Sequence, residues 1–213
     1  MQKLSRKSRR CGERGNAMIE FAALSIVIVP LLFGTVGVGV NLGTMVQAVQ
    51  VSRDVAHMYA RGIDFSQTAN QNIAVALAPN SGMTTTGGNG VIILSKITQV
   101  YQADCTAAAV ATCTNLGQPV FTNRIVIGNA ALTASRYGTP APAIVDASGN
   151  IAAADYLTNA TAVASGFSSV LSAAGLTLVD GDVVYMSETY LSTPDLSFLG
   201  TQASNGVYAR SIF

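Results

Sequence analysis

The chain has 213 residues, of which 11% are charged and 49% are hydrophobic, and its mean hydropathy is +0.40. The charged fraction is less than half of the roughly 25% that is usual in soluble domains, so an ordinary cytosolic enzyme is not expected. The net charge of +1 conceals an asymmetry. Residues 1–15 carry six basic and one acidic side chain, a net charge of +5, whereas residues 16–213 carry six basic and ten acidic side chains, a net charge of −4.

A stretch without any charged side chain runs from Phe21 to Ser52. Its first twenty residues, Phe21–Val40, would rise about 30 Å as a helix, which matches the hydrocarbon thickness of a bilayer. Twelve of them are Phe, Leu, Ile or Val, and together these contribute about −4 to −7 kcal/mol to insertion. We therefore predict a transmembrane span over residues 21–40. The basic residues before the span predict that the amino terminus stays in the cytoplasm and that the residues after the span cross the membrane.

Helical patterning continues beyond the span without a linker. Apolar residues recur at spacings of three and four at Ala48, Val51, Val55 and Met58, and Gly62 is a plausible stop. One helix over residues 16–62, half in lipid and half amphipathic, is the simplest interpretation. A removable secretory signal is the alternative, but the apolar segment is long for one and no A-x-A cleavage site follows it.

The most informative motif lies just before the span, where residues 14–21 read R-G-N-A-M-I-E-F. For an isolated Glu20, a charge that reaches back to the membrane interface is the simplest explanation. Gly15 adds a second one. If the chain were cut after Gly15, the new amine of Asn16 would lie about 6 Å along the helix from Glu20, on nearly the same face. An ammonium and a carboxylate stabilise one another in such a poorly hydrated place.

A basic leader, the pattern G-x-x-x-x-E-F and an apolar helix with V-P-L-L-F-G together resemble a type IV pilin-like precursor. In particular, they resemble the TadE-like pseudopilins of bacterial tight-adherence (Flp) pilus systems. The resemblance covers about residues 14–62. It implies that a prepilin peptidase cuts between Gly15 and Asn16, removes residues 1–15, and leaves Glu20 as the fifth residue of the mature chain. It also implies that Glu20 helps the helices pack during assembly.

The resemblance further implies an inner-membrane protein with a periplasmic domain from residue 63 to residue 213. Its partners would be other pilins or pseudopilins and the assembly machinery, and its place would be in the membrane or at the pilus tip. Two departures favour a minor component over a bulk filament subunit. The chain is far longer than a major Flp pilin, and Phe21 stands where those pilins usually have tyrosine.

Within and just after the span, Gly39 and Gly43 form a small-x-x-x-small pair, which is typical of close helix packing. Glycine is also simply common in membrane helices, and the sequence does not choose between these explanations.

The exported part is predicted to be α+β, with a small antiparallel sheet of about four strands in a pilin-like layout. Its strand signals are runs of β-branched and aromatic residues bounded by turn residues. These runs are Gly90–Tyr101, Val120–Ile127, Asp182–Leu191 and Val207–Phe213. Helices are predicted at Asn70–Leu77 and Gly166–Ala174, both on one face of the sheet, and residues 137–150 read as a loop.

Cysteine placement agrees with export. Cys11 would be lost with the leader, which leaves Cys105 and Cys113 with seven residues between them. In an oxidising compartment a disulfide is the expected state of this pair. A metal site is the competing interpretation, but two cysteines without a nearby His or Cys are an incomplete ligand set.

No catalytic constellation was found in the sequence. The single histidine, His57, belongs to the membrane-proximal helix, and no nucleophile-elbow, zinc-protease or Walker A pattern occurs. We therefore expect no enzyme activity, cofactor, metal, nucleic acid or small-molecule substrate. Besides a pseudopilin, the competing classes are a signal-anchored surface-binding or adhesive domain and, more remotely, a tethered periplasmic enzyme.

Overall fold

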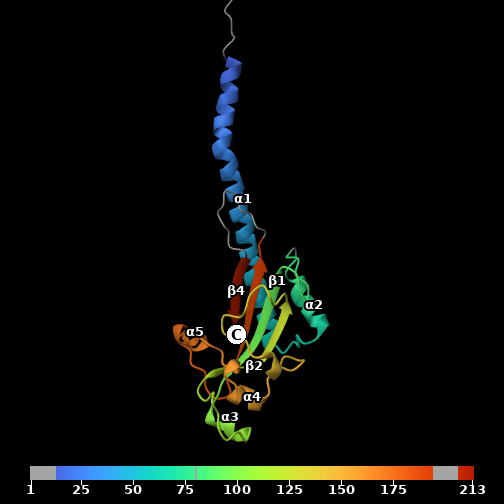
Figure 1. The fold of residues 1–213 in the computed structure, drawn as a ribbon, viewed down its shortest axis with the longest axis vertical. Helices are drawn as coiled ribbons and strands as arrows, with labels where there is room; N and C mark the ends of the chain where they lie inside the picture. Colours follow the sequence, from blue (N-terminus) through green and yellow to red (C-terminus); the bar gives the residue numbers. More distant parts are fainter. Residues whose placement is uncertain (1–12, 80, 194–205) are drawn as a thin grey trace, which may run out of the picture.

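A computed structural model describes residues 13–79, 81–193 and 206–213 of the chain. Its dominant feature is helix α1, Glu13–Ala60, which runs for 48 residues without a break and is therefore about 70 Å long. Figure 1 shows it as a stalk that enters the rest of the molecule only with its carboxyl-terminal part. The helix ends before Gly62, which has a φ of +86° that suits glycine. The prediction of one long helix is confirmed.

The domain below the stalk is built on one antiparallel sheet. Its strands are β1 (Gly90–Gln99), β2 (Pro119–Gly128), β3 (Val183–Ser192) and β4 (Gly206–Ile212), in the spatial order β2-β1-β3-β4. All neighbours are antiparallel, and one irregularity interrupts the β1–β2 register between Lys96 and Ile97. The α+β class and the four strands are as predicted, each to within two residues at its boundaries.

Helix α1 covers one face of this sheet, where it packs on β3 and β4. Small side chains at Ala48, Ser52 and Ala56, all fully buried, let the helix approach the strands closely. Around them, α1 and the sheet share an apolar core that includes Val51, Val55, Tyr59, Ile92, Leu94, Ile127 and Leu191. The last three turns of α1 therefore belong to the folded domain, although they continue the same helix as the predicted span.

Four short helices and two 3₁₀ turns fill the connections. They are α2 (Thr68–Ala76), α3 (Gln102–Ala107), α4 (Ala153–Thr158), α5 (Phe167–Ala173), η1 (Pro142–Ile144) and η2 (Ala160–Ala162). Helix α2 packs into the core on the α1 side through Ala74. Helix α5 packs on the opposite face through Phe167 and Leu171. The expectation that both predicted helices cover one face was wrong, because α1 already packs on the first face over β3 and β4.

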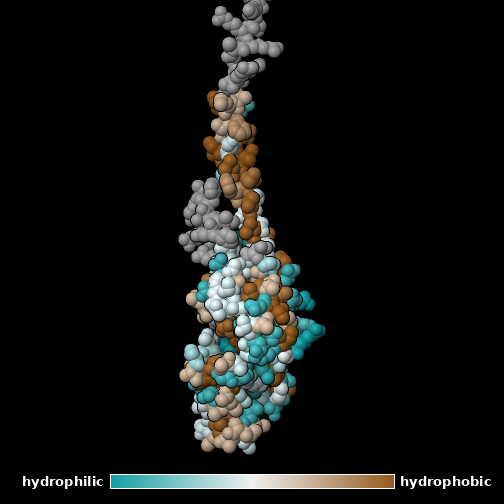
Figure 2. Space-filling view, turned by 90° about the vertical axis from the view of Figure 1, so that its right-hand side faces the viewer, coloured by the Kyte–Doolittle hydropathy of each residue, from teal (hydrophilic) through white to brown (hydrophobic). Residues whose placement is uncertain are grey.

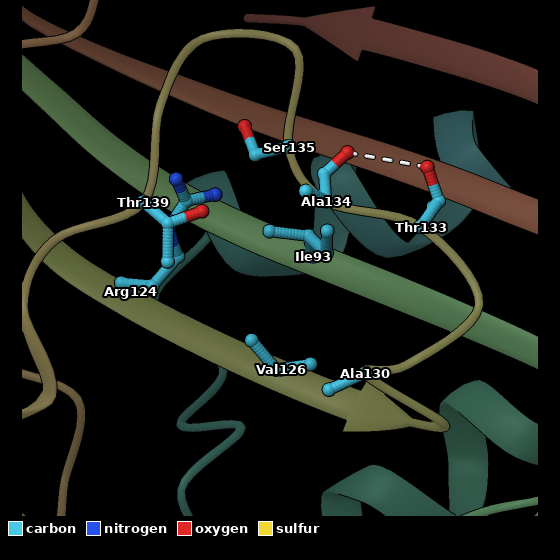
Figure 3. Close-up of a pocket in the computed structure, with 8 residues that line it drawn as sticks. All are labelled: Ile93, Arg124, Val126, Ala130, Thr133, Ala134, Ser135 and Thr139. Carbon is cyan, nitrogen blue, oxygen red and sulfur yellow. Dashed lines mark hydrogen bonds between the residues drawn. The ribbon is translucent and has the colours of Figure 1, made fainter.

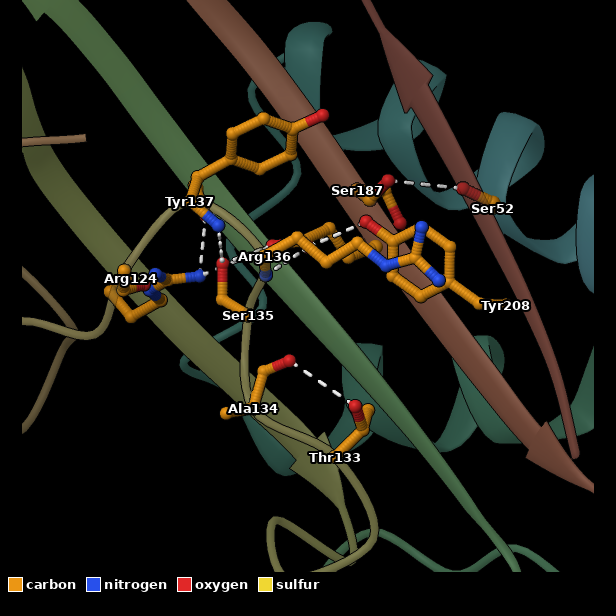
Figure 4. Close-up of polar contacts among 12 residues, drawn as sticks. Ser52, Arg124, Thr133, Ala134, Ser135, Arg136, Tyr137, Ser187 and Tyr208 are labelled. Carbon is orange, nitrogen blue, oxygen red and sulfur yellow. Dashed lines mark hydrogen bonds and ion pairs between the residues drawn. The ribbon is translucent and has the colours of Figure 1, made fainter. Parts of the chain in front are cut away.

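The face opposite α1 contains a buried charge cluster (Figure 4). Arg124 on β2 and Glu188 on β3 are 5% and 1% exposed, and their side chains lie 3.8 Å apart. Arg124 Nη1 donates to Ser95 Oγ at 2.9 Å, and Nη2 donates to the carbonyl of Gly138. The cluster therefore ties the three strands β2, β1 and β3 to the loop that crosses them.

Glu188 is the acceptor at the centre of this cluster. It accepts hydrogen bonds from Tyr208 Oη at 2.6 Å, from the backbone N–H of Arg136 at 2.9 Å, and from the hydroxyl of Ser135. Burial lowers the pKa of Arg124 to about 10, an effect that the Glu188 carboxylate opposes, so the guanidinium stays charged at neutral pH. Burial, reinforced by the Glu188 contact, raises the pKa of Tyr208. The segment 135–138 is thus fastened to the sheet by charge-assisted hydrogen bonds.

Removing the Glu188 carboxylate should destabilise the folded domain. Glu188→Ala leaves the Arg124 guanidinium buried without its countercharge, and we expect a loss of about 3 to 5 kcal/mol in the free energy of unfolding. Denaturant titration of the full chain in detergent, followed by circular dichroism, would measure it. Ser187→Ala is the matched control on the same strand, because its buried hydroxyl has no partner among the described residues and its removal should cost nothing. Equal effects of the two substitutions would contradict this account of the cluster.

Candidate functional site

The part of α1 that lies outside the folded domain is covered with exposed apolar side chains. Met18, Phe21 and Ile26 are 79%, 74% and 75% exposed, and the stretch continues to Val46 at 57%. Among the described residues, one helix is long and apolar enough to cross a membrane, with an 18-residue window of mean hydropathy 2.4. Figure 2 shows this hydrophobic surface rising above a domain of mixed polarity. So much exposed apolar surface needs a cover.

The length of the exposed segment fits a bilayer. Ala48 is the first fully buried residue of α1, so residues 21–47 stand clear of the core and span about 40 Å. A hydrocarbon core takes about 30 Å of this, and the polar interface takes most of the remainder. The interfacial part would hold Asn41, Thr44 and Gln47, of which Gln47 Nε2 donates to the carbonyl of Pro79 at 2.7 Å. That hydrogen bond fixes where the helix leaves the domain.

Polar groups inside the predicted span are satisfied within the helix itself. Ser25 Oγ donates to the carbonyl of Phe21 at 2.8 Å, and Thr35 Oγ1 donates to that of Leu32 at 2.8 Å. Such back-bonding leaves no hydroxyl that needs water. Pro30 lies inside α1 without ending it. Its ring removes one backbone donor, which a membrane helix tolerates when other groups satisfy the freed carbonyl.

The proposed processing motif lies at the free end of α1. Gly15 and Asn16 belong to its first turn, and Glu20 and Phe21 follow on the exposed stretch. Glu20 is 28 residues before Ala48 and so lies about 42 Å along the helix from the domain. Among the described residues, the ion pair that the structure contains is Arg124–Glu188, and Glu20 takes part in none. The residues of the predicted leader before position 13, including Cys11, lie outside the described part of the chain.

Gly39 and Gly43 lie on one face of the exposed segment, one helical turn apart. A Cβ placed on either residue would meet no atom within 4 Å in the described structure. The face they form is therefore not used for packing within the domain. It is open to a helix from another chain, which is what a small-x-x-x-small pair requires.

The two cysteines are joined far from this helix surface. Cys105 on α3 forms a disulfide with Cys113, with the Cα atoms 6.1 Å apart. Cys105 is buried beside Val100, Val120 and Leu157 in a small core of its own. The structure thus pairs the cysteines as predicted, although α3 lies where a plain loop was expected. The bond fastens the connection between β1 and β2 at the end of the domain farthest from the stalk (Figure 1).

Sequence reasoning missed the Arg124–Glu188 cluster and the loop that it holds. Both residues lie within predicted strands, where a single charge normally faces water. Nothing in the local pattern indicates that the two strands flank β1 and place these charges on the same buried face. Within the part of the chain that the structure describes, no group of three or more His, Cys, Asp or Glu side chains is arranged to hold a metal ion.

Comparison of the chain with protein-family models, with curated proteins and with solved structures finds no match. The functional assignment therefore depends on the exposed helix and its motif alone.

The disulfide leads to a simple prediction. Alkylation of the native protein should leave Cys105 and Cys113 unmodified, and reduction followed by alkylation should label both, as peptide mass measurement would show. Replacing both by Ser should lower the free energy of unfolding by about 2 kcal/mol, because the bridge closes only a short loop. Two free thiols in protein taken from its native compartment would contradict the pairing.

Proposed function

We propose that this protein is a minor pseudopilin of a tight-adherence type pilus that contributes to pilus assembly or to the tip. One observation carries the proposal. A single rigid helix presents about 40 Å of exposed apolar surface, is anchored by its other end in a folded domain, and bears the Gly15, Glu20 and Phe21 motif at its free end. A removable secretory signal is cut away from the domain it exports, so its helix is not expected to continue into the core of that domain.

In this proposal the apolar surface of α1 is buried in two successive environments. Lipid covers it while the subunit waits in the inner membrane, and neighbouring helices cover it after extraction. Because α1 is continuous, a pull on the domain is transmitted to the whole span without a hinge. The Gly39–Gly43 face gives a neighbouring helix room to approach closely. The function is mechanical, and it needs no cofactor.

Cleavage after Gly15 would prepare the free end for assembly. The new ammonium of Asn16 and the carboxylate of Glu20 are four residues apart, about 6 Å along the helix axis. Each charge is costly in an apolar surrounding, and pairing reduces that cost, either within one subunit or between neighbours. Glu20 would therefore favour docking of a cleaved subunit beside the next one over its staying isolated in lipid.

The proposed orientation follows from charge. The basic residues of the leader keep the amino terminus in the cytoplasm, where a prepilin peptidase acts, and the domain lies in the periplasm. The disulfide between Cys105 and Cys113 is consistent with that location, because the periplasm is oxidising and keeps such bonds formed. A signal-anchored binding domain that never enters a pilus shares this orientation, but it gives Gly15 and Glu20 no role.

Processing should depend on Gly15. Gly15→Leu puts a bulky side chain at the proposed cleavage site, and we expect at least a tenfold loss of the shorter mature species on gels and in intact-mass spectra. Gly12→Leu makes the same substitution three residues earlier and should leave processing unchanged. Normal amounts of a chain beginning at Asn16 in the Gly15→Leu variant would refute the assignment to a prepilin peptidase.

Assembly should depend on the Glu20 charge. Glu20→Ala and Glu20→Gln should leave the amount in the membrane unchanged but reduce the amount that co-purifies with sheared pili by about tenfold. Asp54→Ala removes an acid from the same helix outside the exposed span and serves as the control. Pilus fractions that contain equal amounts of all four proteins, the wild type included, would exclude Glu20 from the mechanism.

A further inference from the structure

The face of the sheet opposite α1 has a small hollow under the loop that follows β2 (Figure 3). Its volume is about 190 Å³, which suits one branched or aromatic side chain and not a larger ligand. Ile93 and Val126 form its floor, and Ala130 and Ala134 form its wall. The polar end of the hollow is formed by Ser135, Thr139 and the Arg124 side chain. Val126 is 42% exposed although it lies on a strand of the core sheet. The hollow is thus apolar, open and preformed.

Two arginines lie on the same face of the sheet as this hollow: Arg136 on the loop that covers it, and Arg210 on β4, which β3 separates from β1. Arg136 follows Ser135 directly, and its guanidinium lies 3.8 Å from the ring centroid of Tyr208. The guanidinium of Arg210 on β4 lies 5.6 Å from the ring of Tyr137. Both arginines are exposed, and neither is within ion-pair distance of a carboxylate in the described part of the chain. Aromatic rings hold their side chains in place and leave donors for an outside carboxylate.

A matching feature lies at the far end of the domain, in the turn before β3. Leu176 and Val179 are each 59% exposed, more than any other large apolar side chain described outside α1. Asp180 follows Val179 and is also exposed. The turn is held in shape because the Val179 N–H donates to Asp182 Oδ2 at 2.9 Å and Gly181 adopts a φ of +85°. It presents an apolar side chain and a carboxylate next to each other on a fixed backbone.

We propose that this turn of one copy docks on the hollow of a second copy. Val179 enters the apolar hollow, and Asp180 pairs with Arg136 and Arg210 on the same face of the sheet. Charge and polarity favour this partner. Arg136 and Arg210 offer exposed cations, and Asp180 offers an exposed carboxylate. Asp180 lies next to Val179, one of the two most exposed large apolar side chains described outside α1. The proposal goes beyond the function proposed above and does not rest on it, since the surfaces belong to the domain and not to the span.

The contact joins two different surfaces, so a single contact leaves one turn and one hollow free, and further copies can add head to tail. Glu188, which lies opposite Arg210 in the β3–β4 register, is five residues beyond Val183, the first residue of β3, or about 16 Å along the strand. The strands run roughly along the long axis of the molecule (Figure 1). Two docked copies that are held parallel are therefore displaced along that axis by at least this distance. Two copies whose spans lie at equal depth in one membrane cannot form the contact, whereas copies displaced along an assembly can.

Sedimentation of the full chain in a non-ionic detergent tests the proposal through a charge exchange. Wild-type protein should self-associate, and the association should weaken as salt is raised from 50 to 500 mM. Arg210→Glu and Asp180→Arg should each weaken it at least tenfold, and the two substitutions in one chain should restore it. Val179→Ser should weaken it without any change in charge. Arg53→Glu and Asp54→Arg change the same charges on exposed positions of α1 and serve as controls.

Recovery in the double variant together with unchanged controls would establish the contact, because no effect on folding predicts it. A double variant that stays as weak as its parents would overturn the proposal. Wild-type protein that remains monomeric, or association that none of the substitutions changes, would overturn it as well.

Discussion

The structure depends on one continuous helix, α1, whose two halves lie in different environments. The last three turns of α1 are buried against the sheet, where Ala48, Ser52 and Ala56 bring the backbone close to the strands. The preceding 27 residues, from Phe21 to Gln47, expose apolar side chains that water does not favour. No linker separates the two parts. Whatever covers the exposed part, first lipid and then other helices in our proposal, is therefore mechanically coupled to the folded domain.

Helix α1 covers one face of the sheet over β3 and β4, and α2 packs into the core on the same side. The other face is closed by loops and short helices instead of a second long helix, and the Arg124–Glu188 pair fastens the central loop to three strands. That buried pair costs desolvation, which its hydrogen bonds offset. Its effect is to fix the loop that carries Arg136 and borders the hollow beneath it. The anchoring of the domain and its proposed docking surface thus lie on opposite faces of one thin sheet.

Much of this fold could be predicted from sequence because its signals are local. The charge-free run, the spacing of apolar residues up to Met58, and four β-branched runs each report on a single element. Which face of the sheet α2 and α5 pack on could not be predicted, because it depends on the face that α1 occupies. The Arg124–Glu188 pair was equally inaccessible, since its residues lie 64 positions apart and meet only through the strand order. For the candidate site, the motif at Gly15 and Glu20 and the continuous helix were visible in the sequence, but the strands on which the end of that helix packs were not.

The central claim is that the exposed half of α1 is retained in the working protein after a leader is removed. Intact-mass measurement of protein extracted from membranes, with its amino terminus sequenced, tests this claim most directly. The account predicts a chain of 198 residues from Asn16 to Phe213. A chain that begins at Met1 would indicate an uncleaved anchor, and a chain that begins after residue 40 would indicate a removed secretory signal. Either result would contradict the account.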